Sequence, residues 1–133
     1  MKESDIQVMV ADYLRLQYPK VLFHSDFGSG IKLTMGQAAK QKRQNGGRRA
    51  WPDMFIAEPG HTYAGLFIEL KKDGTRLKKK NGEWATPHLA EQAEVLMRLD
   101  DKGYVAKFAC GFDEAKKIID NYLGGTNGAE TQI

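Results

Sequence analysis

Apolar positions along the chain recur with two different periods, and these predict a mixture of helices and strands. A helical period predicts helices over 4–18, 88–102 and 112–123, and short apolar runs predict strands over 21–25, 53–57, 64–71 and 104–110. The glycine-rich, basic stretch 26–49 has no sustained apolar period. We expect it to be a long loop with at most a helical turn around 37–44, and loops of that length in a domain are often functional.

The order of these elements predicts an α/β fold with a small mixed β-sheet flanked by helices on both faces, in the order α-β-β-β-α-β-α. The short turn over 58–62 predicts that the strands on either side of it are antiparallel. The helix over 88–102 lies between two strands, and such a crossover joins parallel neighbours. We therefore expect one domain over 1–123, with 26–50 as a long basic insert and 124–133 as a flexible tail.

Two charges in the apolar strand 64–71 are the first candidates for chemistry. Glu69 and Lys71 are two residues apart, so they point to the same face of the strand. Asp53 opens the preceding strand, and in an antiparallel hairpin it lies at the same end of the sheet as Glu69. Two carboxylates there are suitable oxygen ligands for Mg²⁺ or Mn²⁺. The alternative is a strand-end carboxylate pair in surface ion pairs.

The helix over 88–102 carries a polar residue within its apolar stripe. Gln92 falls between Leu89 and Leu96 on the face that should pack against the sheet. A buried amide needs hydrogen-bonding partners, and a ligand carboxylate or a metal-bound water would provide one. The alternative is a boundary glutamine that reaches solvent.

The first helix offers a third acid and a start signal. Ser4 and Gln7 match a capping box that would begin the helix. Glu3 lies three residues before Ile6, so it can share the inward face and act as a further metal ligand. Its alternative role is the ordinary one of an acid that interacts favourably with a helix N-terminus.

The positive charge of the chain is concentrated in two segments that bracket the candidate acids. The formal net charge is +3, but the chain outside these segments holds more acids than bases. The basic residues of the two segments are Lys32, Lys40, Lys42, Arg43, Arg48 and Arg49 in the first, and Lys71, Lys72, Arg76, Lys78, Lys79 and Lys80 in the second. Their position around Asp53 and Glu69 favours a nucleic-acid substrate over two solvated loops.

Several other classes of protein lack support in the sequence. No apolar run reaches membrane-spanning length, and the chain begins with no signal-like segment, which together with the lone Cys110 predicts a cytoplasmic protein without disulfides. The three histidines are scattered, so no zinc-ligand spacing exists. No Gly-Lys-Ser phosphate loop or dinucleotide fingerprint is present.

The motifs resemble a known nuclease family. Arg49-Ala50-Trp51-Pro52-Asp53-Met54-Phe55-Ile56, followed by Gly65-Leu66-Phe67-Ile68-Glu69-Leu70-Lys71, resembles the PD-(D/E)XK signature. The later residues Leu89, Gln92, Leu96, Leu99, Gly103-Tyr104 and Asn121-Tyr122-Leu123 are similar to its VRR-NUC branch. The resemblance covers most of 3–123 and implies a restriction-endonuclease-like core. The insert 26–50 matches no family motif.

The resemblance implies a Mg²⁺- or Mn²⁺-dependent deoxyribonuclease and a role for each matching residue. Asp53, Glu69 and the main-chain carbonyl of Leu70 would be metal ligands, Lys71 the catalytic lysine and Gln92 a supporting residue, with Glu3 as a further ligand from the first helix. The stand-alone form is similar to phage-encoded members, some of which pair as homodimers and cut branched DNA. The alternative hypothesis is a non-catalytic nucleic-acid-binding module that retains the nuclease fold.

Overall fold

The computed structural model describes residues 1–26, 33–48 and 50–124. The chain forms, in order, α1 (Glu3–Gln17), β1 (Phe23–Ser25), α2 (Met35–Gln44), β2 (Met54–Ile56), β3 (Leu66–Lys71), α3 (Pro87–Asp101), β4 (Val105–Cys110) and α4 (Phe112–Leu123). This confirms the predicted fold class and the predicted order of elements along the chain, with α2 as an additional complete helix. The expected tail beyond residue 124 lies outside the described residues.

The sheet has the strand order β1-β2-β3-β4 and mixes both kinds of pairing. β2 pairs antiparallel with β1 and with β3, and β3 pairs parallel with β4. The register places Met54 opposite Ile68 in the β2–β3 hairpin. These pairings confirm the predicted hairpin and the predicted crossover through α3.

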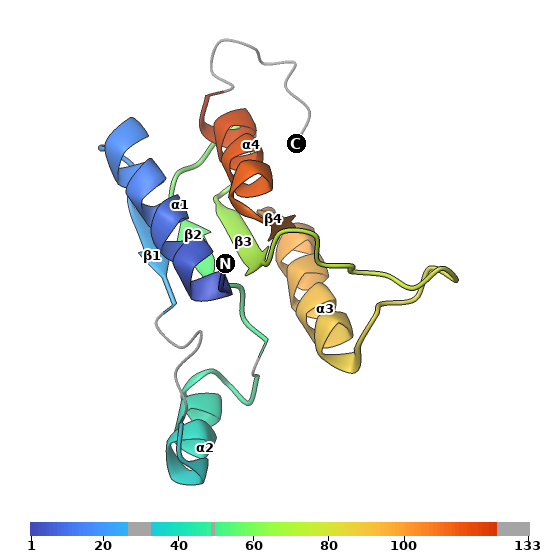
Figure 1. Ribbon diagram of the computed structural model, residues 1–133. Helices are drawn as coiled ribbons and strands as arrows, with labels where there is room; N and C mark the ends of the chain where they lie inside the picture. Colours follow the sequence, from blue (N-terminus) through green and yellow to red (C-terminus); the bar gives the residue numbers. More distant parts are fainter. Residues whose placement is uncertain (27–32, 49, 125–133) are drawn as a thin grey trace.

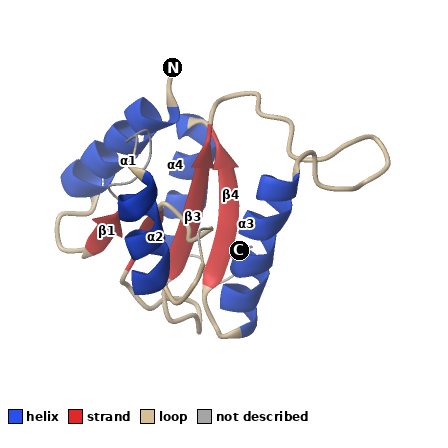
Figure 2. Ribbon diagram, turned by 90° about the horizontal axis from the view of Figure 1, so that it is seen from below, coloured by secondary structure: helices blue, strands red, loops and turns tan. Residues whose placement is uncertain are grey.

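Helices cover both faces of the sheet, as the sequence predicted (Figures 1 and 2). On one face, Leu66, Ile68 and Leu70 of β3 belong to the main apolar core with residues of α1 and α4. On the other face, α3 packs through Val95 and Leu99 against a smaller cluster that includes Phe67. Since side chains alternate along a strand, Glu69 and Lys71 lie on the same face as Phe67 and therefore face α3.

The β2–β3 hairpin requires a glycine directly before β3. A Cβ at Gly65 would lie 2.8 Å from a ring carbon of Phe55, which is closer than real contacts allow. Phe55 in turn stacks on Phe67 with ring centroids 4.4 Å apart. This close approach brings β2 and β3 together and so brings the acid before β2 close to the end of β3.

The predicted start of the first helix was wrong. The helix begins one residue earlier than Ser4, after Lys2, whose backbone N–H donates to the carboxylate of Asp5 at 3.2 Å. Gln7 is not a capping residue, because its side chain is buried and its amide donates to the Ser25 hydroxyl at 2.6 Å and the Asp26 carbonyl at 2.7 Å. It connects α1 to the end of β1 instead.

The basic insert contains a helix that the apolar pattern underestimated. α2 has no buried residue, so it has no apolar stripe by which periodicity could reveal it. A capping box formed by Thr34 and Gln37 begins it, since the Thr34 side chain accepts from the Gln37 N–H at 3.1 Å and the Gln37 side chain accepts from the Thr34 N–H at 3.0 Å. Local capping therefore defines this helix more than packing does. None of the described helices has the length and apolar character to cross a membrane.

Candidate functional site

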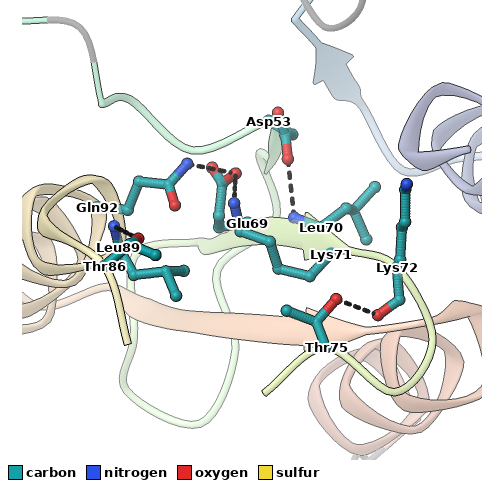
Figure 3. A network of polar contacts seen from close by, with 9 residues as sticks. All are labelled: Asp53, Glu69, Leu70, Lys71, Lys72, Thr75, Thr86, Leu89 and Gln92. Carbon is teal, nitrogen blue, oxygen red and sulfur yellow. Dashed lines mark hydrogen bonds and ion pairs between the residues drawn. The ribbon is translucent and has the colours of Figure 1, made fainter. Parts of the chain in front are cut away.

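The end of β3 holds two buried charges side by side. Glu69 is 3% exposed and Lys71 is 8% exposed. The ammonium of Lys71 lies 3.6 Å from Oε2 of Glu69 (Figure 3). The sequence prediction that these two side chains share a face is thus confirmed, and the two opposite charges reduce the cost of burying each other.

Asp53 joins this pair from the neighbouring strand. It lies one residue before β2, and its carboxylate accepts a hydrogen bond of 2.8 Å from the backbone N–H of Leu70 (Figure 3). This bond fixes the Asp53 side chain beside the end of β3. The expected meeting of Asp53 and Glu69 at one end of the sheet is confirmed.

Pro52 leaves the neighbouring carbonyl of Leu70 without a ladder donor. Extending the observed register by two residues places Pro52 opposite Leu70. A strand residue directs its N–H and C=O to the same partner strand, so the Leu70 carbonyl faces the same side as its N–H. Proline has no N–H to donate to that carbonyl. The sequence Pro-Asp therefore directs both an acid and a backbone carbonyl to one position.

Gln92 of α3 completes the buried network. Its side chain is 6% exposed, and its amide donates to Oε2 of Glu69 at 2.9 Å (Figure 3). The alternative of a solvent-reaching boundary glutamine is therefore wrong. Oε1 of Glu69 and Oε1 of Gln92 are both buried with no hydrogen-bonding partner among the described residues. Buried oxygens without a partner are costly, and a bound cation or water would satisfy them.

The two carboxyl groups titrate abnormally in the metal-free protein. Burial, and then the nearby carboxylate of Asp53, raise the pKa of Glu69 well above its ordinary value, while Lys71 opposes the shift. Burial also raises the pKa of Asp53, and the hydrogen bond from the Leu70 N–H opposes that shift. The pair therefore holds excess negative charge that a proton or a cation stabilises.

This network forms one side of a polar cavity of about 530 Å³. The residues that line it are Glu3, Asp26, Ala38, Gln41, Lys42, Asn45, Arg48, Trp51, Asp53, Glu69, Lys71, His88 and Gln92. Six of these were not site candidates in the sequence analysis: Asp26, Ala38, Gln41, Asn45, Trp51 and His88. Two of them are close in sequence to predicted site residues and could have been found in this way. Trp51 precedes Pro52-Asp53, and His88 lies about one helical turn before Gln92.

The predicted basic residues separate into two groups. Lys42, Arg48 and the buried Lys71 line the cavity, and Arg48 also forms an ion pair of 3.4 Å with Glu94 of α3. The other described basic residues lie exposed outside the cavity, Lys40 and Arg43 on α2 and Lys72, Arg76, Lys78, Lys79 and Lys80 on the loop after β3. Lys32 and Arg49 lie outside the described residues. α2 and the loop lie on opposite sides of α3 (Figures 1 and 2).

The donor set fits a hard divalent cation. Among the described residues, no cluster of three or more acidic, histidine or cysteine side chains is close enough to hold a metal by itself. Mg²⁺, however, is commonly bound through one or two carboxylates and keeps several waters. Asp53, Glu69 and the carbonyl of Leu70 supply that kind of oxygen set, and the unpartnered Oε1 of Glu69 is available. Glu3 lines the same cavity and can add charge to it.

Comparison with known proteins gives one informative likeness. No family model and no curated protein matches the sequence. A solved structure named "VRR_NUC domain protein" is similar with a TM-score of 0.70 and 29% sequence identity, and the match covers 93% of this chain and 89% of that chain. Another, named "VRR_NUC domain", is less similar, with a TM-score of 0.47, 20% identity, and coverage of 88% of this chain and 97% of that chain.

The fold and this likeness define an α/β nuclease-like domain. They confirm the resemblance to the VRR-NUC family that the motifs around Asp53 and Glu69 indicate. A nuclease-like fold in general uses a divalent metal.

Glu69→Gln is expected to stabilise the metal-free protein at high pH. Because the folded state raises the pKa of Glu69, the native state binds more protons than the unfolded state above the ordinary carboxyl range, and stability falls as pH rises. Gln removes this charge and keeps an acceptor for Gln92. In EDTA, we expect the variant to melt at least about 4 °C above wild type at pH 8, with a smaller difference at pH 5. Thermal melts at the two pH values measure this, and an equal difference at both would contradict the buried-charge interpretation.

Proposed function

We propose that this protein is a Mg²⁺- or Mn²⁺-dependent DNA endonuclease. The observation that carries the proposal is the group formed by the half-buried Asp53 and the buried Glu69, Lys71 and Gln92, all of which line one polar cavity. Burying the polar side chains of Glu69, Lys71 and Gln92 together is costly unless something compensates them, and the oxygens of this group suit a cation. Lys42 and Arg48 at the same cavity suit a phosphate backbone.

In this proposal each residue of the site has a separate role. A bound Mg²⁺ or Mn²⁺ would supply Lewis-acid stabilisation for charge that develops on the phosphate. Asp53 and Glu69, together with the Leu70 carbonyl, would hold the ion, and Gln92 would fix the orientation of Glu69 through its 2.9 Å hydrogen bond. The ammonium of Lys71, 3.6 Å from Glu69, would orient the attacking water or neutralise a phosphate oxygen.

Cleavage of closed circular DNA tests the proposal. The purified protein is incubated with single-stranded and duplex circles in Mg²⁺ or Mn²⁺, with EDTA as the control. Linear or nicked products that require the metal would support an endonuclease, because circles present no ends to an exonuclease. DNA binding without any metal-dependent cleavage would instead support the non-catalytic binding module.

A preference for branched DNA and a homodimer are finer proposals that come from the family resemblance. Four-way junctions, flaps, duplexes and single strands compared in one assay would test the substrate. Sedimentation of the free protein would test the oligomeric state.

Neutralising Arg48 of the cavity together with Arg49, its neighbour in sequence, is expected to reduce the salt dependence of DNA binding. Each lost phosphate contact should lower the slope of log affinity against log salt by about one unit. We expect Arg48→Gln with Arg49→Gln to weaken binding to all sequences about equally, because phosphate contacts carry little base information. Titrations at several salt concentrations in EDTA measure the slope.

A matched control removes two charges elsewhere. Arg15 lies near the C-terminal end of α1 and Lys20 just beyond it, whereas Glu3 at the other end of this helix, about 20 Å away, lines the cavity. Arg15→Gln with Lys20→Gln should leave the slope unchanged. Equal slopes for wild type and both double variants would show that Arg48 and Arg49 do not belong to the DNA-binding surface.

A further inference from the structure

Trp51 is a large aromatic side chain at the edge of the cavity that neither the fold nor the proposed chemistry uses. It is 40% exposed and lines the cavity with Asp53 and Glu69. One side of its ring is supported by Phe67, with centroids 6.2 Å apart at 51°. Phe67 is itself held by stacking on Phe55 at 4.4 Å. The indole is therefore supported from within the protein while a substantial part of it remains accessible.

The position of Trp51 relative to the acids is fixed by the backbone. Only Pro52 separates it from Asp53, and proline has a restricted φ angle. The Asp53 carboxylate is fixed in turn by the Leu70 N–H. Because Trp51 and Asp53 are only two residues apart in the chain, a flat ligand stacked on the indole would lie close to the carboxylate pair.

The opposite side of the cavity is formed by one face of α2. Ala38, Gln41, Lys42 and Asn45 all line the cavity and recur at helical spacing. The other residues that line the cavity belong to five further parts of the chain: α1, the end of β1, the segment that precedes β2, the strand β3, and α3. A ligand that approaches Asp53 and Glu69 therefore passes amide and ammonium groups on the α2 side of the cavity. Such groups can form hydrogen bonds with phosphates and base edges.

The size of this space limits what can occupy it. A volume of about 530 Å³ lies within the range of sites for small molecules. It is large enough for one or two nucleotides. An aromatic platform beside positive charge is the combination by which proteins bind unpaired bases.

We propose that the cavity takes a single DNA strand, with an unpaired base stacked on Trp51 and its phosphate directed to Asp53 and Glu69. Lys42 and Arg48 contact the backbone of the same strand. This inference rests on the proposed nuclease function of the site and names its substrate as DNA that is unpaired at the point of cleavage. Trp51 is a substrate-positioning residue in this scheme.

Binding measurements with Trp51 variants test the proposal without any cleavage. The wild-type protein in EDTA is titrated with a fluorescent single-stranded oligonucleotide and with the matching duplex. Trp51→Leu keeps apolar cover over Phe67 and removes the aromatic platform, whereas Trp51→Phe keeps a platform. We expect Trp51→Leu to lower single-strand affinity about 5- to 140-fold, with a much smaller effect on duplex affinity and near-complete rescue by Trp51→Phe.

Trp84→Leu is the matched control, because this second tryptophan packs on Phe108 and lies outside the cavity. It should not change the ratio of single-strand to duplex affinity. Far-UV circular dichroism of each variant verifies the fold. Equal losses of single-strand and duplex affinity in Trp51→Leu, or no loss at all, would overturn the stacking proposal.

The Trp51 binding result and the DNA cleavage result test the two proposals separately. If the protein cleaves DNA with metal but Trp51→Leu binds single strands like wild type, the nuclease proposal stands and the stacking proposal fails. If the Trp51-dependent preference for single strands is present and metal-dependent cleavage is absent, the cavity is a single-strand binding site and the nuclease proposal fails.

Discussion

Asp53→Asn is expected to reduce metal-dependent DNA cleavage by at least about 10³-fold, because it removes one of two charged ligands for the ion. Asn keeps a side-chain oxygen, so it can still accept the 2.8 Å hydrogen bond from the Leu70 N–H and preserve the fold. Initial rates on circular DNA at saturating Mg²⁺ or Mn²⁺ measure the loss. Asp53→Ala should be as inactive, and less stable because the Leu70 N–H loses its partner.

Asp26 offers a matched control for this result. It lines the same cavity but belongs to neither the Pro-Asp nor the Glu-Leu-Lys motif, and its side chain is exposed. Asp26→Asn removes the same charge from the cavity without touching the carboxylate pair, so it should reduce the rate by less than tenfold. Cleavage by Asp53→Asn at the wild-type rate would rule out this carboxylate pair as the catalytic centre.

Lys71→Ala is expected to lower the cleavage rate by roughly 10²–10⁴-fold with little change in metal affinity. The ammonium lies beside Glu69 in a buried position, so its removal leaves that carboxylate without its opposite charge. A group that acts on water or phosphate should affect the maximal rate more than the metal concentration needed for half-maximal rate. Metal titrations of the cleavage rate separate these two quantities.

Lys72→Ala is the control for the loss of one positive charge. Lys72 follows directly in sequence but is exposed, whereas Lys71 is buried on the α3 side of β3. We expect Lys72→Ala to weaken DNA binding slightly and to leave the maximal rate unchanged. Similar small effects of both substitutions would assign Lys71 to an ordinary ion pair with Glu69.

The strand pattern was sufficient to predict the central part of the site. Alternation along β3 places Glu69 and Lys71 on one face, and a short connection makes β2 and β3 antiparallel, which brings Asp53 to the same end. These relations depend on residues that are close in sequence. The burial of Gln92 was also predictable, because it falls on a regular apolar stripe of α3.

Other features left no periodic signal in the sequence. α2 has no buried face, so its ten-residue extent was visible only through its Thr34–Gln37 capping box. The interpretation of Gln7 as a cap failed because a long-range contact with Ser25 and Asp26 competes with local capping. Such contacts depend on how α1 lies against the sheet.

The sequence by itself determined the identity of the candidate metal ligands, since strand alternation and the Pro52-Asp53 pair act over a few residues. Only the tertiary structure decided what surrounds them. It brings Trp51, His88 and Asp26 to the same cavity from three separate segments, and it places the polar face of α2 there. Contacts between distant segments are set by the packing of helices on the sheet, and no local pattern of residues encodes which exposed side chains that packing brings together.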